Sequence, residues 1–150
     1  PVLSRIHSQC ITGESFFSMR CDCRFQLTES LKQIAQNGRG VIFYLQQEGR
    51  GIGLSNKIKA YSLQDKGLDT VEANHQLGFK DDERTYENIA VMVKYLAIKK
   101  LDLMTNNPKK IKALEDMGIK VNKRVPIFSD TNKYNERYIS TKKSKLGHLI

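Results

Sequence analysis

The sequence predicts a single domain of the α/β (α+β) class, with a mixed central β-sheet flanked by helices. Three observations predict it: short apolar runs alternate with amphipathic segments, glycine or proline separates them, and neither a repeat nor a linker interrupts the 150 residues. Strands that alternate with helical segments indicate a sheet covered by helices. A chain of this length buries about 70% of its unfolded surface without disulfides, so one domain over residues 1–150 is expected.

The first half of the chain is expected to hold two strands and two helices. The apolar opening PVLSRI and the run Gly40–Leu45 have the β-branched and aromatic content of buried strands. Between them, Thr28 is a candidate cap for a helix that ends near Gly38. After a glycine-rich loop, Leu54–Lys66 is expected to form a helix that Gly67 terminates.

The second half continues the alternation. Residues 84–98 have a helical apolar pattern, and Leu101–Met104 has the composition of a buried strand. Asn107 is a candidate cap for a helix that ends at Gly118, and IKV begins a further strand after it. The C-terminal stretch RYISTKKSKLGHLI has no clear pattern.

The formal net charge is +9, and residues 120–150 carry +6 of it. This balance indicates an anionic partner, although a solvated basic tail explains the C-terminal charge equally well. No run approaches the ~18 apolar residues of a membrane span, and the N-terminus lacks a signal-peptide pattern, so a cytoplasmic protein without a membrane partner is expected. The chain begins at Pro1 inside a strand-like run, which suggests that upstream residues are missing.

All three cysteines lie in the stretch CITGESFFSMRCDC, at Cys10, Cys21 and Cys23. An odd number argues against a disulfide framework, and the spacing is not that of a four-ligand structural zinc site. Three thiolates fit a catalytic zinc, which keeps one position open, and His7 is the nearest candidate for a fourth ligand. The segment must turn, because alternate residues of an extended strand point to opposite faces. Buried free thiols are the alternative interpretation.

Two further motifs have the composition of a phosphate site. Glu48, Gly49 and Arg50 follow a predicted strand and precede a predicted helix, where backbone N–H groups receive phosphate, although any tight turn uses glycine. Asp82 stands two residues before Arg84, an arrangement that suits either phosphate chemistry or simple capping. Thr105 and Lys110 lie around a strand end and a helix start.

Taken together, the segments RIHSQCITGESFFSMRCDC, QQEGRGIGLSNKIKAYSLQDKGLDTVEANHQLGF, DDER and TNNPKK resemble the GTP cyclohydrolase II family. The resemblance is strong over residues 2–125 and looser as far as KLGHLI. It implies hydrolysis of GTP that opens the guanine imidazole ring at C8 and releases formate and pyrophosphate. The product would be 2,5-diamino-6-(5-phosphoribosylamino)pyrimidin-4(3H)-one, made in the first step of riboflavin biosynthesis. The resemblance also implies one Zn²⁺ per chain, Mg²⁺ and a homodimer.

The resemblance assigns roles residue by residue. Zinc would be held by Cys10, Cys21 and Cys23, and the water that it activates would attack C8. Arg84 falls at the position of a proposed nucleophile toward the α-phosphate, with Asp82 as proton acceptor. A guanidinium is a poor nucleophile, so a role for Arg84 that only stabilises phosphoryl charge stays open. The positions that contact GTP would be Arg5, Ile6, His7, Ser8, Gln9, Gln26, Glu48, Gly49, Arg50, Thr70, Thr105 and Lys110.

Tyr61 matches a family tyrosine near C8 that is thought to assist the ring chemistry, and relatives that replace it tend to stop at a formylated intermediate. Its place on one side of a predicted helix with Leu54 and Ile58 also permits a pure packing role. The same resemblance makes residues 1–150 a GTP cyclohydrolase II domain that lacks some N-terminal residues, and members of the family sometimes carry a fused dihydroxybutanone phosphate synthase domain.

Two positions depart from the family pattern. Gln9 stands where the family usually has Glu, and Arg24 replaces the glycine that commonly follows C-D-C. If that position needs a positive φ, Arg24 would strain the turn that gathers the thiols.

Two alternatives remain beside the leading interpretation. One is a family member that binds GTP but is catalytically impaired. The other is a zinc-stabilised basic module that binds nucleic acid, which is disfavoured because aromatic residues are not interleaved with the basic tail, so no nucleic-acid partner is expected. A lid over a triphosphate site is one hypothesis for residues 125–150.

Overall fold

The computed structural model describes residues 1–129 and 131–150. Its sheet has the strand order β2-β1-β3-β4, and each neighbouring pair is parallel. The predicted α/β class with a central sheet is confirmed, but the sheet is parallel throughout the described residues, where a mixed one was expected. The strands are β1 (Val2–Ser8), β2 (Val41–Leu45), β3 (Leu101–Met104) and β4 (Val121–Val125).

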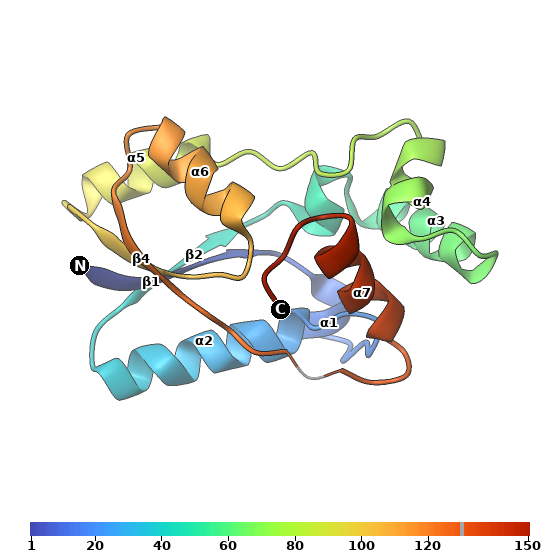
Figure 1. The fold of residues 1–150 in the computed structure, drawn as a ribbon, viewed down its shortest axis with the longest axis horizontal. Helices are drawn as coiled ribbons and strands as arrows, with labels where there is room; N and C mark the ends of the chain where they lie inside the picture. Colours follow the sequence, from blue (N-terminus) through green and yellow to red (C-terminus); the bar gives the residue numbers. More distant parts are fainter. Residues whose placement is uncertain (130) are drawn as a thin grey trace.

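Helices cover both faces of this sheet (Figure 1). One helix, α2, lies along one face, and α5 and α6 lie on the other, while α3, α4 and α7 are grouped beyond one end of the sheet. The helices are α1 (Ile11–Glu14), α2 (Cys23–Asn37), α3 (Leu54–Asp65), α4 (Thr70–Gln76), α5 (Glu87–Tyr95), α6 (Pro108–Asp116) and α7 (Glu136–Ser144), and a short 3₁₀ helix, η1, spans Glu48–Gly51.

The apolar core lies between the sheet and α5 and α6. Ile6, Phe43, Leu101, Ile89 and Leu114 are each at most 2% exposed and belong to one cluster. Burying a side chain of this size contributes about 1.5–3 kcal/mol. Parallel strands are buried on both faces, which explains the continuous apolar runs seen in the sequence.

The carboxyl ends of β1, β2 and β3 are adjacent in this sheet, and the sequence motifs follow them directly. Cys10 comes after β1, Glu48 after β2 and Thr105 after β3. In parallel α/β sheets, ligands bind outside this edge. The topology therefore brings three motifs that are far apart in the chain to one end of the sheet.

Several predicted elements are confirmed: β2, β3, α3, and α6, at whose start the side chain of Asn107 accepts a hydrogen bond from the backbone N–H of Lys109. The predicted cap at Thr28 is wrong, because α2 begins at Cys23 and the backbone N–H of Gln26 already bonds to the carbonyl of Asp22. The helix expected from residue 84 begins at Glu87 instead.

Three of the α-helices were not predicted: α1, α4 and α7. At α4, Asp69 and Glu72 form a reciprocal capping box, a signal that the stretch DTVE carries in the sequence. At α7, the sequence is rich in lysine and lacks apolar periodicity, yet the helix buries Ile139, Thr141 and Lys142. Within residues 1–129 and 131–150, no helix has both the length and the apolar character needed to cross a bilayer.

Candidate active site

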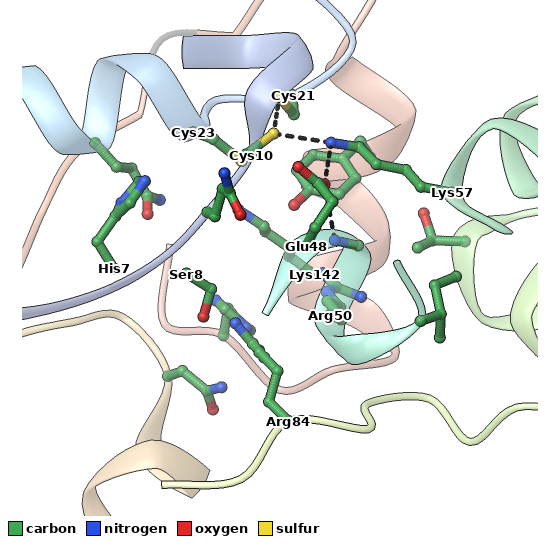
Figure 2. A pocket seen from close by; sticks show the side chains of 18 of the residues that line it. His7, Ser8, Cys10, Cys21, Cys23, Glu48, Arg50, Lys57, Arg84 and Lys142 are labelled. Atoms are coloured by element: carbon green, nitrogen blue, oxygen red, sulfur yellow. Dashed lines mark hydrogen bonds and ion pairs between the residues drawn. The ribbon is translucent and has the colours of Figure 1, made fainter. Parts of the chain in front are cut away.

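A cavity opens at the carboxyl edge of the sheet (Figure 2). Its lining comes from the ends of β1, β2 and β3, from the buried sides of α3 and α4, and from α7 near the C-terminus. Every predicted site residue except Asp82 lines it, including Ile6, Ser8, Gln9, Gly49, Thr70 and Thr105. Residues that the sequence motifs did not single out also line it, among them Lys57, Asn74, Asn106, Tyr138, Lys142 and His148.

The three thiols meet in this cavity. The Sγ atoms of Cys10, Cys21 and Cys23 all lie within 4.8 Å of one another, and the three cysteines are free. The segment turns through Asp22 and enters α2 at Cys23, which confirms the turn expected of the C-x-C pair. Gly13 packs directly on the cluster, because a Cβ there would lie 2.9 Å from the Sγ of Cys21.

His7 does not belong to this cluster. Within the part of the chain that the structure describes, the three cysteines alone form a group of potential metal ligands, so the suggestion of His7 as a fourth ligand is wrong. Its Nε2 faces Glu14 Oε1 at 3.3 Å, and its ring stacks against that of Tyr44 with 5.6 Å between centroids. Burial and the nearby charge of Arg5 lower the pKa of His7, against the opposing effect of Glu14.

Lys57 contacts the thiol cluster, although the sequence motifs did not indicate it. Its Nζ donates a hydrogen bond to Cys10 Sγ at 3.0 Å and another to Glu48 Oε1 at 2.7 Å (Figure 2). Burial alone would lower the pKa of Lys57, but the hydrogen bond to Glu48 raises it above its ordinary value, so the side chain stays charged. Lys57 precedes Tyr61 by one helical turn on α3, and this spacing could have indicated it.

The donor set fits a thiophilic metal ion. Hydrogen bonds from Cys21 and Cys23, joined by the charge of Lys57, hold the pKa of the Cys10 thiol far below its usual range despite burial, whereas the hydrogen bond to Cys10 and burial raise the pKa values of Cys21 and Cys23. Thiolates are the form that binds metal, and they favour soft or borderline ions such as zinc. The cluster can therefore hold a metal ion. Three protein ligands leave a fourth coordination position for water or substrate.

The rest of the lining is strongly basic. Glu48 is the one carboxylate among the described lining residues, against six basic side chains: Arg5, Arg50, Lys57, Arg84, Lys110 and Lys142. Burial lowers the pKa of Arg5 to about 10, and burial with the charge of Arg5 lowers the pKa of Lys110 well below its ordinary value. Arg5 Nε and Arg50 Nη1 are buried and have no hydrogen-bond partner among residues 1–129 and 131–150. Such a surface suits a ligand with several negative charges.

Asp82 lies outside the lining and holds Arg84. Its carboxylate accepts hydrogen bonds from Arg84 Nε at 2.8 and 3.1 Å, from Arg84 Nη2, and from the backbone N–H of Arg84 at 3.0 Å. The last bond closes a local turn ahead of α5, which begins at Glu87. Burial would lower the pKa of Arg84, but the hydrogen bond to Asp82 raises it above its ordinary value.

Tyr61 faces the cavity, and burial raises its pKa to about 12. Leu54 and Ile58 are 43% and 50% exposed. The sequence pattern placed Tyr61 on the same side of α3 as these two residues, and that side is not a packed face. The guanidinium of Arg20 lies 4.3 Å from the centroid of the Tyr61 ring.

The expected strain at Arg24 does not arise. Arg24 lies in the first turn of α2 and is absent from the residues with positive φ. Its guanidinium lies 3.7 Å from the centroid of the exposed Phe17 ring, outside the cavity. The substitution of the usual glycine is therefore compatible with the turn that gathers the thiols.

Comparison with known proteins agrees with this site. The family model described as GTP cyclohydrolase II matches residues 1–126. The whole chain aligns with proteins named GTP cyclohydrolase-2 from Campylobacter hominis (60% identical, 76% of that protein covered), Shewanella amazonensis (58%, 73% covered) and Azotobacter vinelandii (57%, 72% covered). On the match to the family model and on these identities over its full length, the chain belongs to the GTP cyclohydrolase II family.

Proposed function

We propose that this protein is a zinc-dependent GTP cyclohydrolase II, which opens the guanine ring of GTP at C8 and releases formate and pyrophosphate. The observation that carries the proposal is that three thiols and six basic side chains line one cavity. A metal site and a polyanion site in one place fit a reaction in which a nucleoside triphosphate presents its base to the thiols and its phosphates to the basic wall.

The chain's own residues have separate tasks in this proposal. Cys10, Cys21 and Cys23 would hold one zinc ion, which supplies an activated water near neutral pH. The unpartnered guanidinium nitrogens of Arg5 and Arg50 are available to phosphate oxygens. Mg²⁺ would enter with the triphosphate, whose oxygens are its preferred ligands.

Arg84 and Asp82 act on the α-phosphate in this proposal. Because Asp82 keeps Arg84 charged, the arrangement favours stabilisation of phosphoryl charge over nucleophilic attack by Arg84. Asp82 would orient the guanidinium toward the cavity. Tyr61 would assist at the base, since it shares the cavity with the thiols.

The test is one reaction of zinc-replete protein with GTP and Mg²⁺, in which formate, pyrophosphate and the nucleotide product are measured together. Equal amounts of formate and pyrophosphate support the proposal. Pyrophosphate without formate would contradict the role of the thiol cluster. If neither product forms, the protein is a GTP-binding relative that has lost turnover.

We also propose that the protein is a homodimer. The family resemblance supports this, as do large apolar side chains that the single chain leaves exposed after α1: Phe16 (74%), Phe17 (60%) and Met19 (53%). Light scattering coupled to size-exclusion chromatography should give twice the mass of one chain, and the mass of a single chain would contradict the proposal.

A further inference from the structure

The last part of the chain packs against the cysteine loop. We call residues 127–129 and 131–150 the C-terminal arm; it includes α7, which Figure 1 shows close to α1 and to the start of α2. The arm lies beyond residues 1–126, which the family model matches. It nevertheless supplies Tyr138, Lys142 and His148 to the lining of the cavity.

One buried ion pair joins the arm to the loop. Lys142 Nζ lies 2.6 Å from Asp22 Oδ1, and their side chains are 7% and 1% exposed. Asp22 is the residue between Cys21 and Cys23. A carboxylate this deeply buried needs partners, because removing one partner of a buried ion pair leaves an uncompensated charge. The residue that links two of the thiols is therefore paired with a lysine 120 residues away in the sequence.

The same carboxylate collects two more hydrogen bonds. Asp22 Oδ2 accepts from Ser129 Oγ in the arm at 2.5 Å and from Gln26 Nε2 at 2.7 Å. The amide oxygen of Gln26 accepts in turn from Arg5 Nη2. A continuous polar network thus runs from the arm through the cysteine loop to an arginine of β1 that lines the cavity.

Other contacts fix the arm around this ion pair. The backbone N–H of Leu149 donates to the carbonyl of Asn106 at 2.7 Å, and Lys145 pairs with both Asp69 and Glu72 at the start of α4. Arg137 donates to the carbonyl of Gly67. The arm is therefore attached to the loop after β3 and to α4 as well as to the cysteine loop.

We propose that Lys142 is a positioning residue of the metal and nucleotide site: it holds Asp22 and so sets the geometry of Cys21 and Cys23, which makes the docked arm part of the site. The proposal rests on the function proposed above, because that function identifies the ligands of the site as zinc and a nucleotide. In physical terms, the docking of the arm is coupled to the binding of metal by the thiols. If the arm orders the thiols, then metal bound to the thiols must in turn stabilise the docking of the arm.

The first experiment compares Lys142→Met and Lys142→Arg with wild type by competition for zinc against a chromogenic chelator. Lys142→Met should weaken zinc affinity about 10- to 100-fold, as loss of a residue that supports metal ligands does elsewhere. Lys142→Arg keeps the charge and should recover most of the affinity, and Lys143→Met, on the exposed neighbour, should match wild type. Wild-type affinity in a folded Lys142→Met protein would overturn the proposal.

A double-mutant cycle separates the ion pair from general damage. Asp22→Asn and Lys142→Met should each weaken zinc binding, and the double variant should lose less than the sum of the two, because the pair acts as a unit. Strictly additive losses would overturn the proposal.

The second experiment needs no variant. In the wild-type protein, the amide hydrogens of α7 should exchange faster after the zinc is removed with a chelator. Their exchange rate should return to its original value when zinc is added back. Unchanged exchange in α7 would overturn the coupling. Neither experiment uses GTP, so a protein that passes both but releases no formate would contradict the proposed function and leave this inference standing.

Discussion

Lys57 Nζ lies 3.0 Å from the Sγ of Cys10, although 47 positions separate the two residues in the chain. The contact places a fixed positive charge against a cluster that, with three thiolates and one divalent ion, would carry a charge of −1. An ammonium group at this distance stabilises the thiolate form of Cys10. It also holds Glu48, whose other carboxylate oxygen accepts from the backbone N–H of Ile11, beside the cysteine.

Replacing Lys57 should therefore weaken metal binding. We expect Lys57→Met to lower zinc affinity about 10- to 100-fold, since it removes the charge beside Cys10 and the ion-pair partner of Glu48. Metal content after dialysis against a weak chelator measures this. Lys59→Met, on the exposed side of the same helix, is the matched control. Full zinc retention by Lys57→Met would contradict the assigned contact.

Gly13 should not tolerate a side chain. The Cβ of Gly13→Ala would lie 2.9 Å from Cys21 Sγ and 3.3 Å from Cys10 Sγ, so at least one thiol must move. Overpacking of this kind costs about 1–3 kcal/mol, and here we expect much of it to appear as lost metal affinity. Zinc titration of the variant checks the effect, with Ser15→Ala as an exposed control nearby. Equal affinities of the two variants would show that the cluster adapts.

Arg84 should be needed for pyrophosphate release and not for metal binding. We expect Arg84→Ala to lower the rate of pyrophosphate release at least about 10³-fold while zinc content stays at the wild-type level, because its guanidinium faces the cavity apart from the thiols. Arg84→Lys keeps the charge and should retain measurable activity if charge stabilisation is its role. Activity in Arg84→Lys no higher than in Arg84→Ala would instead favour a nucleophilic role. Arg39→Ala, on the surface, controls for loss of positive charge.

Tyr61 should affect one of the two hydrolytic events. Tyr61→Phe keeps the ring that Arg20 covers and removes only the hydroxyl group. We expect formate release to fall about 10²-fold while pyrophosphate release continues, so that a formylated nucleotide accumulates. Mass spectrometry of the product mixture measures it. A parallel fall in both products would indicate that Tyr61 supports binding instead.

The binding of GTP should take up a proton at Lys110. In the free site, burial and the charge of Arg5 lower the pKa of Lys110, and a bound triphosphate would raise it. Affinity should thus be highest below the free-site pKa of Lys110 and fall as the pH rises from that value toward the pKa in the complex. The charged and titratable groups that face Lys110 are Arg5, His7, Asp82, Arg84, Tyr86, Lys142 and His148.

Calorimetry in two buffers of different ionisation enthalpy counts the protons taken up. The measurement belongs above the pH at which the terminal phosphate is fully ionised, so that this group does not contribute. Lys110→Met should remove the uptake. Uptake that persists unchanged in this variant would assign the proton to another group.

Local patterns in the sequence predicted much of the fold. The apolar runs that became β2 and β3, the glycine that follows α3 and the Asn107 cap each depend on neighbours within a few residues. The start of α2 was misplaced because Asp22 and Cys23 were interpreted as a metal loop alone, whereas the structure uses them as a helix start too. The missed α7 lacks periodicity because its buried face includes a lysine, Lys142, that pairs with a distant carboxylate.

The sequence by itself determined which motifs the fold gathers at one cavity: the three cysteines, the EGR loop, Arg84 and the residues after β3. Only the tertiary structure decided that Lys57 touches Cys10, that His7 faces Glu14 and stays outside the thiol cluster, and that the C-terminal arm reaches Asp22. The physical reason is the distance along the sequence over which each kind of interaction acts. Helix caps and strand periodicity act over a few residues, whereas these contacts form between segments that become neighbours only when the parallel sheet brings their ends together.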